Sequence, residues 1–459
     1  MARDIPSSST SPSSGIKVIV VGLGLAGLTT AIECHRKGHS VIVLERITQL
    51  KHDAGDGIAI GPNAVRIIRQ WGSEVVAEID RTRCDATHAD MMDHCDKFIA
   101  RNELPGKGQQ FVTNRAKLVS ILYEHAKGLG IDIRFGAQVT EYWETSDEAG
   151  VIVNGEDRLA ANCVVCADGV NGMSRQFITG EKVDRTRKET GWATFRAHID
   201  TNSEPFASDP EAQWVLKGTS EQDQAYAWFG EGVNMAMLTM GRGKDLVWMT
   251  THWDCYGAEE TWSGGGGHAK LADAMAAIDH WPGKERIQAV IRHTQPSKLV
   301  NHPLVYRPPL KTWISPGGRA ILIGDAAHPY FPVVGQGGSQ GMEDGAVIAV
   351  TLALAGKDQV PLGLRAAEKI RYPRASVIQL GSSALQEALL RPDWETVAKD
   401  PDLFRFPNPD WVFNHDCQEY THLVFETVVQ AIQTGSEYIP SNIPVDGVYR
   451  VENTYNVEA

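Results

Sequence analysis

The chain has 459 residues, of which 42% are hydrophobic and 22% are charged, and its formal net charge is −13. This length and composition are expected of a globular protein with two or three domains. The negative charge argues against binding to nucleic acid or to an anionic membrane, and an apolar run such as Val347–Ala355 is too short for a membrane span. Residues 1–14 are rich in serine and are expected to be a disordered leader.

Seven cysteines, an odd number scattered along the chain, are typical of a protein of the reducing cytoplasm. Cys163 and Cys166 match C-x-x-C, but they lie in an apolar run that is predicted to be a buried strand. A redox pair is expected at a helix N-terminus instead, and the sequence offers no second pair to complete a zinc site. We therefore expect a structural role for both cysteines, no metal site and a cytoplasmic location.

The first strong signal is a glycine-rich turn between two predicted strands. An apolar run at residues 16–21 predicts a strand buried on both faces, and Gly22, Gly24 and Gly27 then fit G-x-G-x-x-G ahead of a helical pattern and a second strand. The first glycine of this motif allows a tight turn, the second lets a pyrophosphate approach the backbone, and the third lets helix and strand pack closely. Glu45 ends the second strand. Its distance along the sequence from the glycine-rich turn is close to the one at which an acid binds a ribose hydroxyl in this kind of unit. The stretch predicts a Rossmann-like unit that binds an adenine dinucleotide.

The rest of the chain alternates between two patterns of predicted secondary structure. Helices and short strands are predicted to about residue 181, followed by β-rich runs with turn residues between them, Ala212–Lys217 among them, which predict an antiparallel sheet. The pattern of strands and helices then returns, with a strand predicted at 320–323 and a helix after it. We therefore expect an α/β protein whose cofactor domain is interleaved with the sheet. The expected parts are a cofactor domain over 15–181 and 301–360, a substrate-binding sheet domain over 182–300 and a C-terminal helical region over 361–459.

Two further motifs follow the glycine-rich turn. Asp168-Gly169 ends a predicted buried strand, and Gly324-Asp325-Ala-Ala-His-Pro329 follows a later strand. In this order and at these spacings the chain resembles the class A flavoprotein monooxygenases, single-component FAD enzymes that hydroxylate or epoxidise electron-rich aromatics. It resembles most their salicylate-hydroxylase-like branch and the fungal monooxygenases of indole-alkaloid biosynthesis. The resemblance covers about residues 16–374.

The resemblance implies a set of FAD contacts. The residues concerned are Gly22, Gly24, Gly27, Glu45, Gly57, Ile58, Arg115, Asp168, Asp325, Gly335, Gly337 and Gly338. Among these, Asp325 would bind the FAD ribose, and Arg115 would reach the pyrophosphate or the ribityl chain. The backbone amides of residues 335–338 would stabilise negative charge on the reduced flavin. Alternatives remain for two of these residues: Arg115 could be a surface arginine, and Asp168 could simply end a strand. Gly172 stands where the family usually has serine.

Three residues are candidates for catalysis. Arg196 lies on the first strand of the predicted sheet, which in this family roofs the flavin, and its guanidinium would anchor the substrate or stabilise a developing alkoxide. Asp56, beside Gly57, would pair with a substrate amine or act as a general acid, unless it is a solvated loop residue. Tyr226 on a neighbouring strand would share the pocket or pack in the core.

Two smaller expectations concern aromatic side chains and a histidine. Several tryptophans of the sheet, Trp192, Trp214, Trp228, Trp248 and Trp253, would form an aromatic pocket or the core. His328 is expected to have a structural role, with its side chain satisfied by the backbone.

The implied activity consumes NADH or NADPH and O2. NAD(P)H would reduce FAD, and reduced flavin with O2 would give a C4a-hydroperoxide whose distal oxygen passes to an electron-rich carbon. We expect an indole-type alkaloid, oxygenated across C2–C3, as the substrate of a monomer or weak homodimer. A phenolic substrate hydroxylated on its ring is the alternative, and a non-oxygenating FAD-dependent dehydrogenase is a second one.

Overall fold

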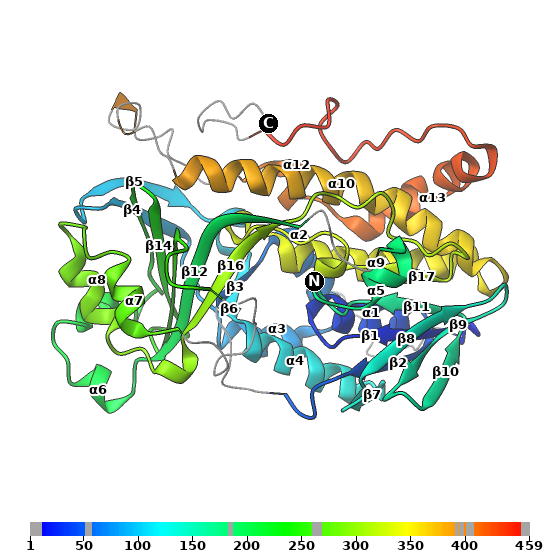
Figure 1. The fold of residues 1–459 in the computed structure, drawn as a ribbon, viewed down its shortest axis with the longest axis horizontal. Coiled ribbons are helices and arrows are strands. Elements are labelled where there is room, and N and C mark those ends of the chain that lie inside the picture. Colours follow the sequence, from blue (N-terminus) through cyan, green and yellow to red (C-terminus); the bar gives the residue numbers. More distant parts are fainter. Residues whose placement is uncertain are drawn as a thin grey trace, which may run out of the picture.

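The computed structural model describes residues 12–50, 57–181, 187–258, 269–390, 394, 399–400 and 408–450. Residues 1–11 of the expected leader, and Asp56, lie outside this part. Figure 1 shows a parallel-sheet domain on the right and a larger mixed sheet on the left, with the long helix α10 (Val360–Leu390) along the top of both. The class is α/β, as predicted.

A five-stranded sheet forms the centre of the first domain. Its order is β17 (Ala320–Leu322), β11 (Cys163–Cys166), β1 (Lys17–Val21), β2 (Ser40–Glu45) and β7 (Asp132–Phe135), and every pairing is parallel. Because β17 comes from beyond residue 300, two separated segments of the chain build this sheet, as predicted. The strands are buried on both faces, which is why they read as continuous apolar runs.

The helices of this domain are α1 (Leu25–Arg36), α2 (Pro62–Arg69), α3 (Ser73–Asp80), α4 (Arg115–Gly128), α5 (Ser174–Thr179) and α9 (Gly337–Ala355). Two of them, α1 and α9, pack closely against each other. A side chain at Gly345 of α9 would come within 2.7 Å of the backbone nitrogen of Thr30 in α1. The two helices can therefore pack this closely only because α9 carries glycine there.

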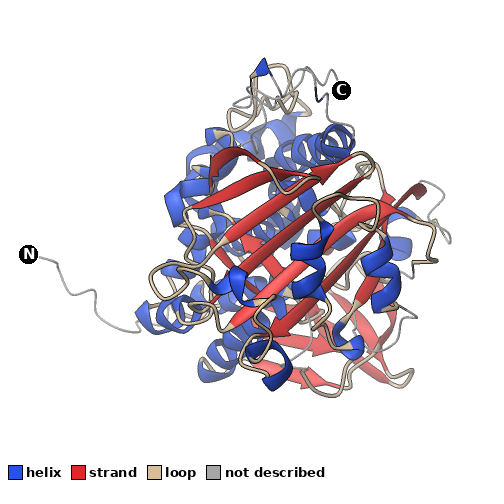
Figure 2. Cartoon of the chain, turned by 90° about the vertical axis from the view of Figure 1, so that its left-hand side faces the viewer, coloured by secondary structure: helices blue, strands red, loops and turns tan. Residues whose placement is uncertain are grey.

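The second domain is a seven-stranded sheet, seen face-on in Figure 2 with short helices in front of it. Its order is β16 (Val300–Tyr306), β12 (Lys188–Asp200), β15 (Asp245–Trp253), β14 (Val233–Met240), β13 (Ala225–Gly230), β4 (His88–Asp93) and β5 (Phe98–Glu103). The sheet is mixed rather than purely antiparallel, because β13 and β4 run parallel. Since β4 and β5 come from before residue 181, the sheet is not one continuous insertion.

One face of this sheet is covered by α6 (Glu204–Ala207), α7 (Leu271–Ala276) and α8 (Lys284–Ile291). The segment predicted as a strand at Ala212–Lys217 forms a 3-10 turn, η2 (Gln213–Leu216), instead. Its residue Val215 is fully buried against the sheet. Packing of apolar side chains, rather than strand pairing, therefore explains the apolar run that suggested a strand.

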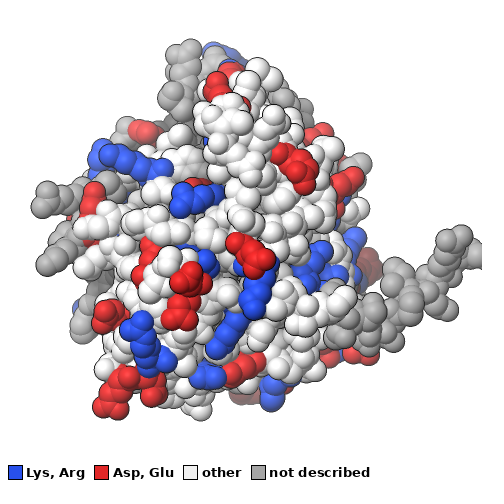
Figure 3. Space-filling view, turned by 90° about the vertical axis from the view of Figure 1, so that its right-hand side faces the viewer, with Lys and Arg blue, Asp and Glu red and all other residues white. Residues whose placement is uncertain are grey.

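The remaining elements connect the two sheets. They are the two-stranded β3 (Gly57–Ile60) and β6 (Phe111–Asn114), the three-stranded β8 (Val139–Glu144), β9 (Ala149–Val153) and β10 (Asp157–Ala161), and the C-terminal α12 (Asp410–Phe413) and α13 (Cys417–Thr434). On the face that Figure 3 shows, acidic and basic side chains are interspersed rather than gathered by sign.

Two negative findings apply to the described residues alone. No single helix among them is both long and apolar enough to cross a membrane, although Gly337–Ala355 with Lys357–Leu390 passes such a test as a pair bent by 115°. No group of three or more histidine, cysteine, aspartate or glutamate side chains among them could hold a metal ion. Cys163 and Cys166 are buried in β11, where burial raises the pKa of each thiol, for Cys163 to about 12. A neutral buried thiol fits a structural role.

Candidate cofactor and substrate site

The glycine-rich turn has the geometry that its sequence predicts. Gly22 adopts a φ of 105°, and a side chain there would lie 2.3 Å from the carbonyl oxygen of Ala167. A side chain at Gly27 would lie 2.0 Å from the carbonyl oxygen of Gly22, whereas one at Gly24 would meet nothing within 4 Å. The first and third glycines are therefore needed for packing, and the second leaves open space at the N-terminus of α1. Open space beside free helical N–H groups fits a pyrophosphate.

Glu45 lies beside this turn at the end of β2. Its Oε2 accepts a hydrogen bond from the backbone N–H of Leu23 at 2.8 Å, and its Oε1 accepts one from the N–H of Ile47 at 3.1 Å. The carboxylate is thus held against the glycine-rich turn, and it retains further acceptor capacity for a hydroxyl. The ribose-binding role that the spacing predicted for Glu45 stays a prediction.

Asp325 lies in the short turn η4 (Gly324–Ala326) after β17. Gly324 has a φ of 56°, and a side chain there would come within 3.1 Å of the Cβ of Ala26 in α1. Its N–H donates to Oδ2 of Asp344 at 3.0 Å. Within the described residues the half-buried Asp325 carboxylate has no hydrogen bond or ion pair. The structure therefore places an available acceptor beside the start of α1, as expected of a ribose ligand.

The loop before α9 meets the same region from a third direction. Gly335 takes a φ of 60°, and Gly337 begins α9. A side chain at Gly338 would approach within 3.2 Å the terminal methyl groups of Ile58 in β3 and Leu25 in α1. The N-terminus of α9 therefore faces β3 and α1, and its free N–H groups favour negative charge there.

The pairing of β3 with β6 brings in Gly57 and Arg115. Gly57 pairs with Asn114, the N-cap residue of α4, and Arg115 is the first residue of that helix. A side chain at Gly57 would lie 2.9 Å from Cγ2 of Val247 in β15. The β3–β6 ribbon thus lies between the parallel-sheet domain and the large sheet. Ile58 lies beside the start of α9, and Arg115 follows the residue that pairs with Gly57; contacts of these residues with the cofactor stay predictions.

Asp168 uses its carboxylate within the protein. It accepts hydrogen bonds from the Tyr142 hydroxyl at 2.9 Å, from the Ser174 N–H at 3.0 Å and from the Ser174 hydroxyl. Burial raises its pKa, which these hydrogen bonds partly offset. A side chain at Gly172 would lie 2.1 Å from the Asp168 carboxyl carbon, so glycine is required where the family usually has serine. A contact of Asp168 with the cofactor stays a prediction.

Arg196 lies on the face of the large sheet that points toward the other domain. It pairs with Met249 of β15, so the two side chains share a face. Val247, two residues along the same strand, is on that face too and contacts Gly57. Arg196 is 8% exposed. The structure therefore brings Arg196 to the sheet face that covers β3, while its position over the flavin stays a prediction.

Tyr226 lies on the opposite face, and here the expectation of a shared pocket is corrected. Tyr226 pairs with Met237, Met237 with Trp248, and Trp248 with Ala197, the neighbour of Arg196 in β12. Because successive residues of a strand point to opposite faces, this ladder places Tyr226 away from Arg196. Its ring packs edge-on against Trp214 at 5.3 Å. The alternative of core packing is the one that agrees with the structure.

The sheet tryptophans divide in the same way. Trp228 and Trp248 are fully buried under the covering helices, with Trp214 packed against them. Trp192 and Trp253 pair across β12 and β15 on the Arg196 face, with ring centroids 4.9 Å apart and planes at 85°. Trp253 is 55% exposed. An aromatic surface near Arg196 is thus made by two of the five tryptophans.

A buried group of charges behind the cofactor turns was missed by sequence reasoning. It comprises Glu343 and Asp344 of α9, Arg371 and Arg374 of α10, and His328, whose Nε2 lies 2.6 Å from Asp344. His328 is thus satisfied by a carboxylate, not by the backbone as expected. The available signal was a pair of adjacent acids near the start of an otherwise apolar helix, together with two arginines one turn apart in another.

Comparison with known proteins decides the family. A family model described as an FAD binding domain matches residues 15–379. The chain belongs to this family. It is 58% identical over 418 residues to the FAD-dependent monooxygenase fmqB of Aspergillus fumigatus, an alignment that covers 88% of this chain and 99% of that protein. The chain is accordingly an FAD-dependent monooxygenase, and the open space at Gly24 fits its cofactor.

Two solved structures of high similarity agree with this assignment. The crystal structure of FqzB has a TM-score of 0.87 and 59% identity, over 96% of this chain and 99% of that one. The structure of CtdE in complex with FAD and a substrate has a TM-score of 0.85 and 38% identity, over 91% of this chain and 100% of that one. The fold of this FAD-binding chain is therefore that of class A flavin monooxygenases.

Proposed function

We propose that this monooxygenase consumes NADH or NADPH and O2 to oxygenate an indole at C2–C3, within a bulky alkaloid substrate. FAD, when bound, supplies the two-electron redox chemistry and the activation of O2. The chain itself binds and orients both molecules and excludes water between them. The single observation that supports this division of labour best is the position of Arg196 on the sheet face above Gly57.

The cofactor would be held by the turns around the start of α1. The backbone N–H groups that follow Gly24, at the start of α1, would bind the pyrophosphate. Glu45 and Asp325 would each accept a hydrogen bond from a ribose hydroxyl. The N-terminus of α9, beginning at Gly337, would face the flavin ring and favour negative charge on it. Arg115, at the start of α4, would add a positive charge near the phosphates.

Arg196 would bind the substrate. A guanidinium is a cation with forked donors, which suit a carbonyl oxygen or a developing alkoxide. Burial of this charge on the face above β3 strengthens its interactions relative to those in water. Asp56, which precedes Gly57 in the chain, is proposed to pair with a substrate amine.

A flat aromatic substrate is supported by the pair formed by Trp192 and Trp253. The two rings stand edge to face on the Arg196 side of the sheet, and Trp253 keeps 55% of its surface exposed. Edge-to-face and stacked arrangements favour another aromatic ring as a partner. The relative CtdE has been crystallised in complex with both FAD and a substrate, which supports binding of a small molecule together with the cofactor.

We also propose that the enzyme works as a monomer or weak homodimer in the cytoplasm. Its cofactor domain would comprise residues 15–181 and 301–360, except that β4, β5 and β16 pair in the substrate-binding sheet of residues 182–300. Residues 361–459 would form the C-terminal helical part. A non-oxygenating dehydrogenase is not supported, because the relatives are named monooxygenases.

The test is oxidation of NADH or NADPH by the purified protein with a panel of indole alkaloids and phenols, followed by mass spectrometry of the products. Faster NAD(P)H oxidation with indoles, together with a product one oxygen heavier, supports the proposal. Faster oxidation with phenols alone would mean that the substrate is a phenol and not an indole. Arg196→Gln should retain FAD but lose product formation by about 100-fold. Arg101→Gln, which breaks an ion pair on the exposed edge strand β5, is the control and should behave as the wild type.

A further inference from the structure

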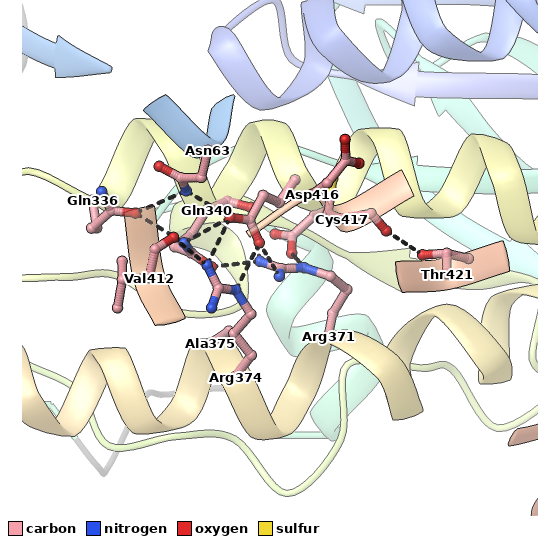
Figure 4. A network of polar contacts seen from close by, with 12 residues as sticks. Asn63, Gln336, Gln340, Arg371, Arg374, Ala375, Val412, Asp416, Cys417 and Thr421 are labelled. Atoms are coloured by element: carbon pink, nitrogen blue, oxygen red, sulfur yellow. Dashed lines mark hydrogen bonds and ion pairs between the residues drawn. The ribbon is translucent and has the colours of Figure 1, made fainter. Parts of the chain in front are cut away.

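The charged cluster behind the cofactor turns is fully buried and balanced in charge. Glu343 and Asp344 of α9 face Arg371 and Arg374 of α10, and each of the four side chains is at most 2% exposed. Figure 4 shows Arg371 and Arg374 reaching from α10 toward α9, where Gln340 lies among their polar partners. Despite burial, Arg374 and Arg371 hold the pKa of the Glu343 carboxyl below its usual range. His328 and Arg371 do the same for the pKa of Asp344, so both acids remain ionised.

Asp344 holds the turn that carries Asp325. Its Oδ2 accepts from the backbone N–H of Gly324 at 3.0 Å and lies 2.6 Å from Nε2 of His328, while its Oδ1 accepts from Nε of Arg371 at 2.8 Å. The residues on either side of the Asp325 turn are thus tied to α9 and α10 through one carboxylate. Movement of α10 would be transmitted directly to this turn.

Glu343 connects the N-terminal part of α9 to α2 and α10. Its Oε1 accepts from Nδ2 of Asn63 at 2.6 Å and its Oε2 from Nε of Arg374 at 3.0 Å. Asn63 also donates to Oε1 of Gln336, the residue that caps α9 beside Gly337, at 3.1 Å. Arg374 donates in turn to the carbonyl oxygens of Trp411 and Val412 in α12. Three elements, α9, α2 and α10, therefore meet at this one carboxylate, and α12 is joined to it through Arg374.

We propose that Glu343, together with Arg374, is a positioning residue that sets the N-terminus of α9 against β3 and so tunes the flavin. This rests on the proposed assignment of residues 335–338 to the flavin ring. A buried carboxylate with several charged and amide partners has few alternative arrangements, because leaving any partner unpaired is unfavourable. The N–H groups at the start of α9 are thereby fixed in advance, as electrostatic stabilisation of a reduced cofactor requires.

Gly61 offers a way to disturb this arrangement without changing any charge. Its N–H donates to the Ser339 hydroxyl at 2.9 Å, and a side chain there would lie 2.6 Å from Oδ1 of Asn63 and 2.8 Å from Nε2 of Gln336. These two amide atoms are buried and have no hydrogen-bond partner within the described residues. With a φ of −70°, alanine at this position adds no backbone strain. Gly61→Ala therefore displaces the amide pair above all, with a lesser approach of 3.1 Å to Cδ1 of Phe413.

The experiment compares Glu343→Gln, Arg374→Lys and Gly61→Ala with wild type. The readouts are the flavin absorption spectrum and the midpoint potential, measured with a chemical reductant so that neither NAD(P)H nor substrate is needed. We expect all three to retain FAD, to shift the spectrum and to change the relative affinity for oxidised and reduced flavin by about tenfold. Arg374→Lys should shift less than Glu343→Gln, since it keeps the charge.

The control is Asp223→Asn. Asp223 is another buried carboxylate, which accepts from the N–H of Gly243 at 2.9 Å and the hydroxyl of Thr239 at 3.0 Å, far from the cofactor turns in the sheet domain. It should lower thermal stability while leaving the spectrum and potential unchanged. If Glu343→Gln does not fold, Gly61→Ala and Arg374→Lys carry the test. An unaltered spectrum and potential in folded, FAD-loaded variants would overturn the proposal, whatever the substrate proves to be.

Discussion

Alanine at Gly24 or at Gly27 should separate cofactor binding from folding. At Gly24 the added methyl group meets no atom within 4 Å, and the φ of −75° suits alanine. Reduced entropy of the unfolded chain stabilises by ~0.4–1 kcal/mol, which the poorer helix cap offsets by a similar amount. The stability of the cofactor-free protein should therefore change by less than about 0.5 kcal/mol. At Gly27 the methyl group would lie 2.0 Å from a backbone oxygen, and we expect a loss of ~2 kcal/mol or more.

Binding of FAD should be weakened most by Gly24→Ala, the variant of the two that affects folding least. The Gly24→Ala methyl group fills the space proposed for the pyrophosphate, and we expect affinity for FAD to fall about 100-fold. At a free FAD concentration 100 times the wild-type Kd, the cofactor stabilises the wild type by ~2.7 kcal/mol, and the variant should lose nearly all of this gain. Titration of flavin fluorescence and thermal melts with and without FAD measure both effects. Wild-type affinity in Gly24→Ala, or destabilisation of its cofactor-free form to match Gly27→Ala, would refute the reasoning.

Three further predictions follow from single side chains. Asp325→Ala should be purified with markedly less bound flavin, measured by the ratio of flavin to protein absorbance, because its carboxylate is otherwise unengaged in the described structure; full retention would contradict its assignment to the ribose. Tyr226→Phe should change turnover by less than about twofold, since its side chain lies on the sheet face away from Arg196; a collapse of turnover would show that this face takes part. Burial and the charge of Arg374 lower the pKa of His415 from 6.5 to about 3, so below pH 6.5 the unfolded chain binds a proton that the folded protein does not. Stability should fall by ~2 kcal/mol between pH 6.5 and pH 5, and urea midpoints of His415→Gln should lack this part of the decline.

Local signals predicted the cofactor half of the site. The turn at Gly22, Gly24 and Gly27, the strand that follows it and the acid at Glu45 lie within one short stretch, so their geometry depends on nearby residues. The division of labour among the glycines, two for packing and one for open space, agrees with the prediction in every position. Asp325 could be found in the same way, because it follows a buried strand at a turn.

The substrate half depended on information that the sequence does not carry. Both faces of the large sheet are covered, one by helices and the other by β3 and α10, so Arg196 and Tyr226 both sit in strands without a polar face. An alternating pattern distinguishes the faces only when one of them meets water. The ladder from Tyr226 to Ala197 was needed to show that the two side chains point apart.

The sequence by itself determined the dinucleotide-binding fold and the geometry of its glycine-rich turn, because helix, turn and strand are set by neighbouring residues. Only the tertiary structure decided which side chains face the flavin region and which charges stand behind it. Glu343 and Arg371 are 28 positions apart, and Glu343 and Asn63 are 280 apart. Their pairing is produced by the packing of α9, α10 and α2 against one another, which no local pattern specifies, and burial makes that pairing obligatory because an ionised carboxylate cannot be left alone in the protein interior.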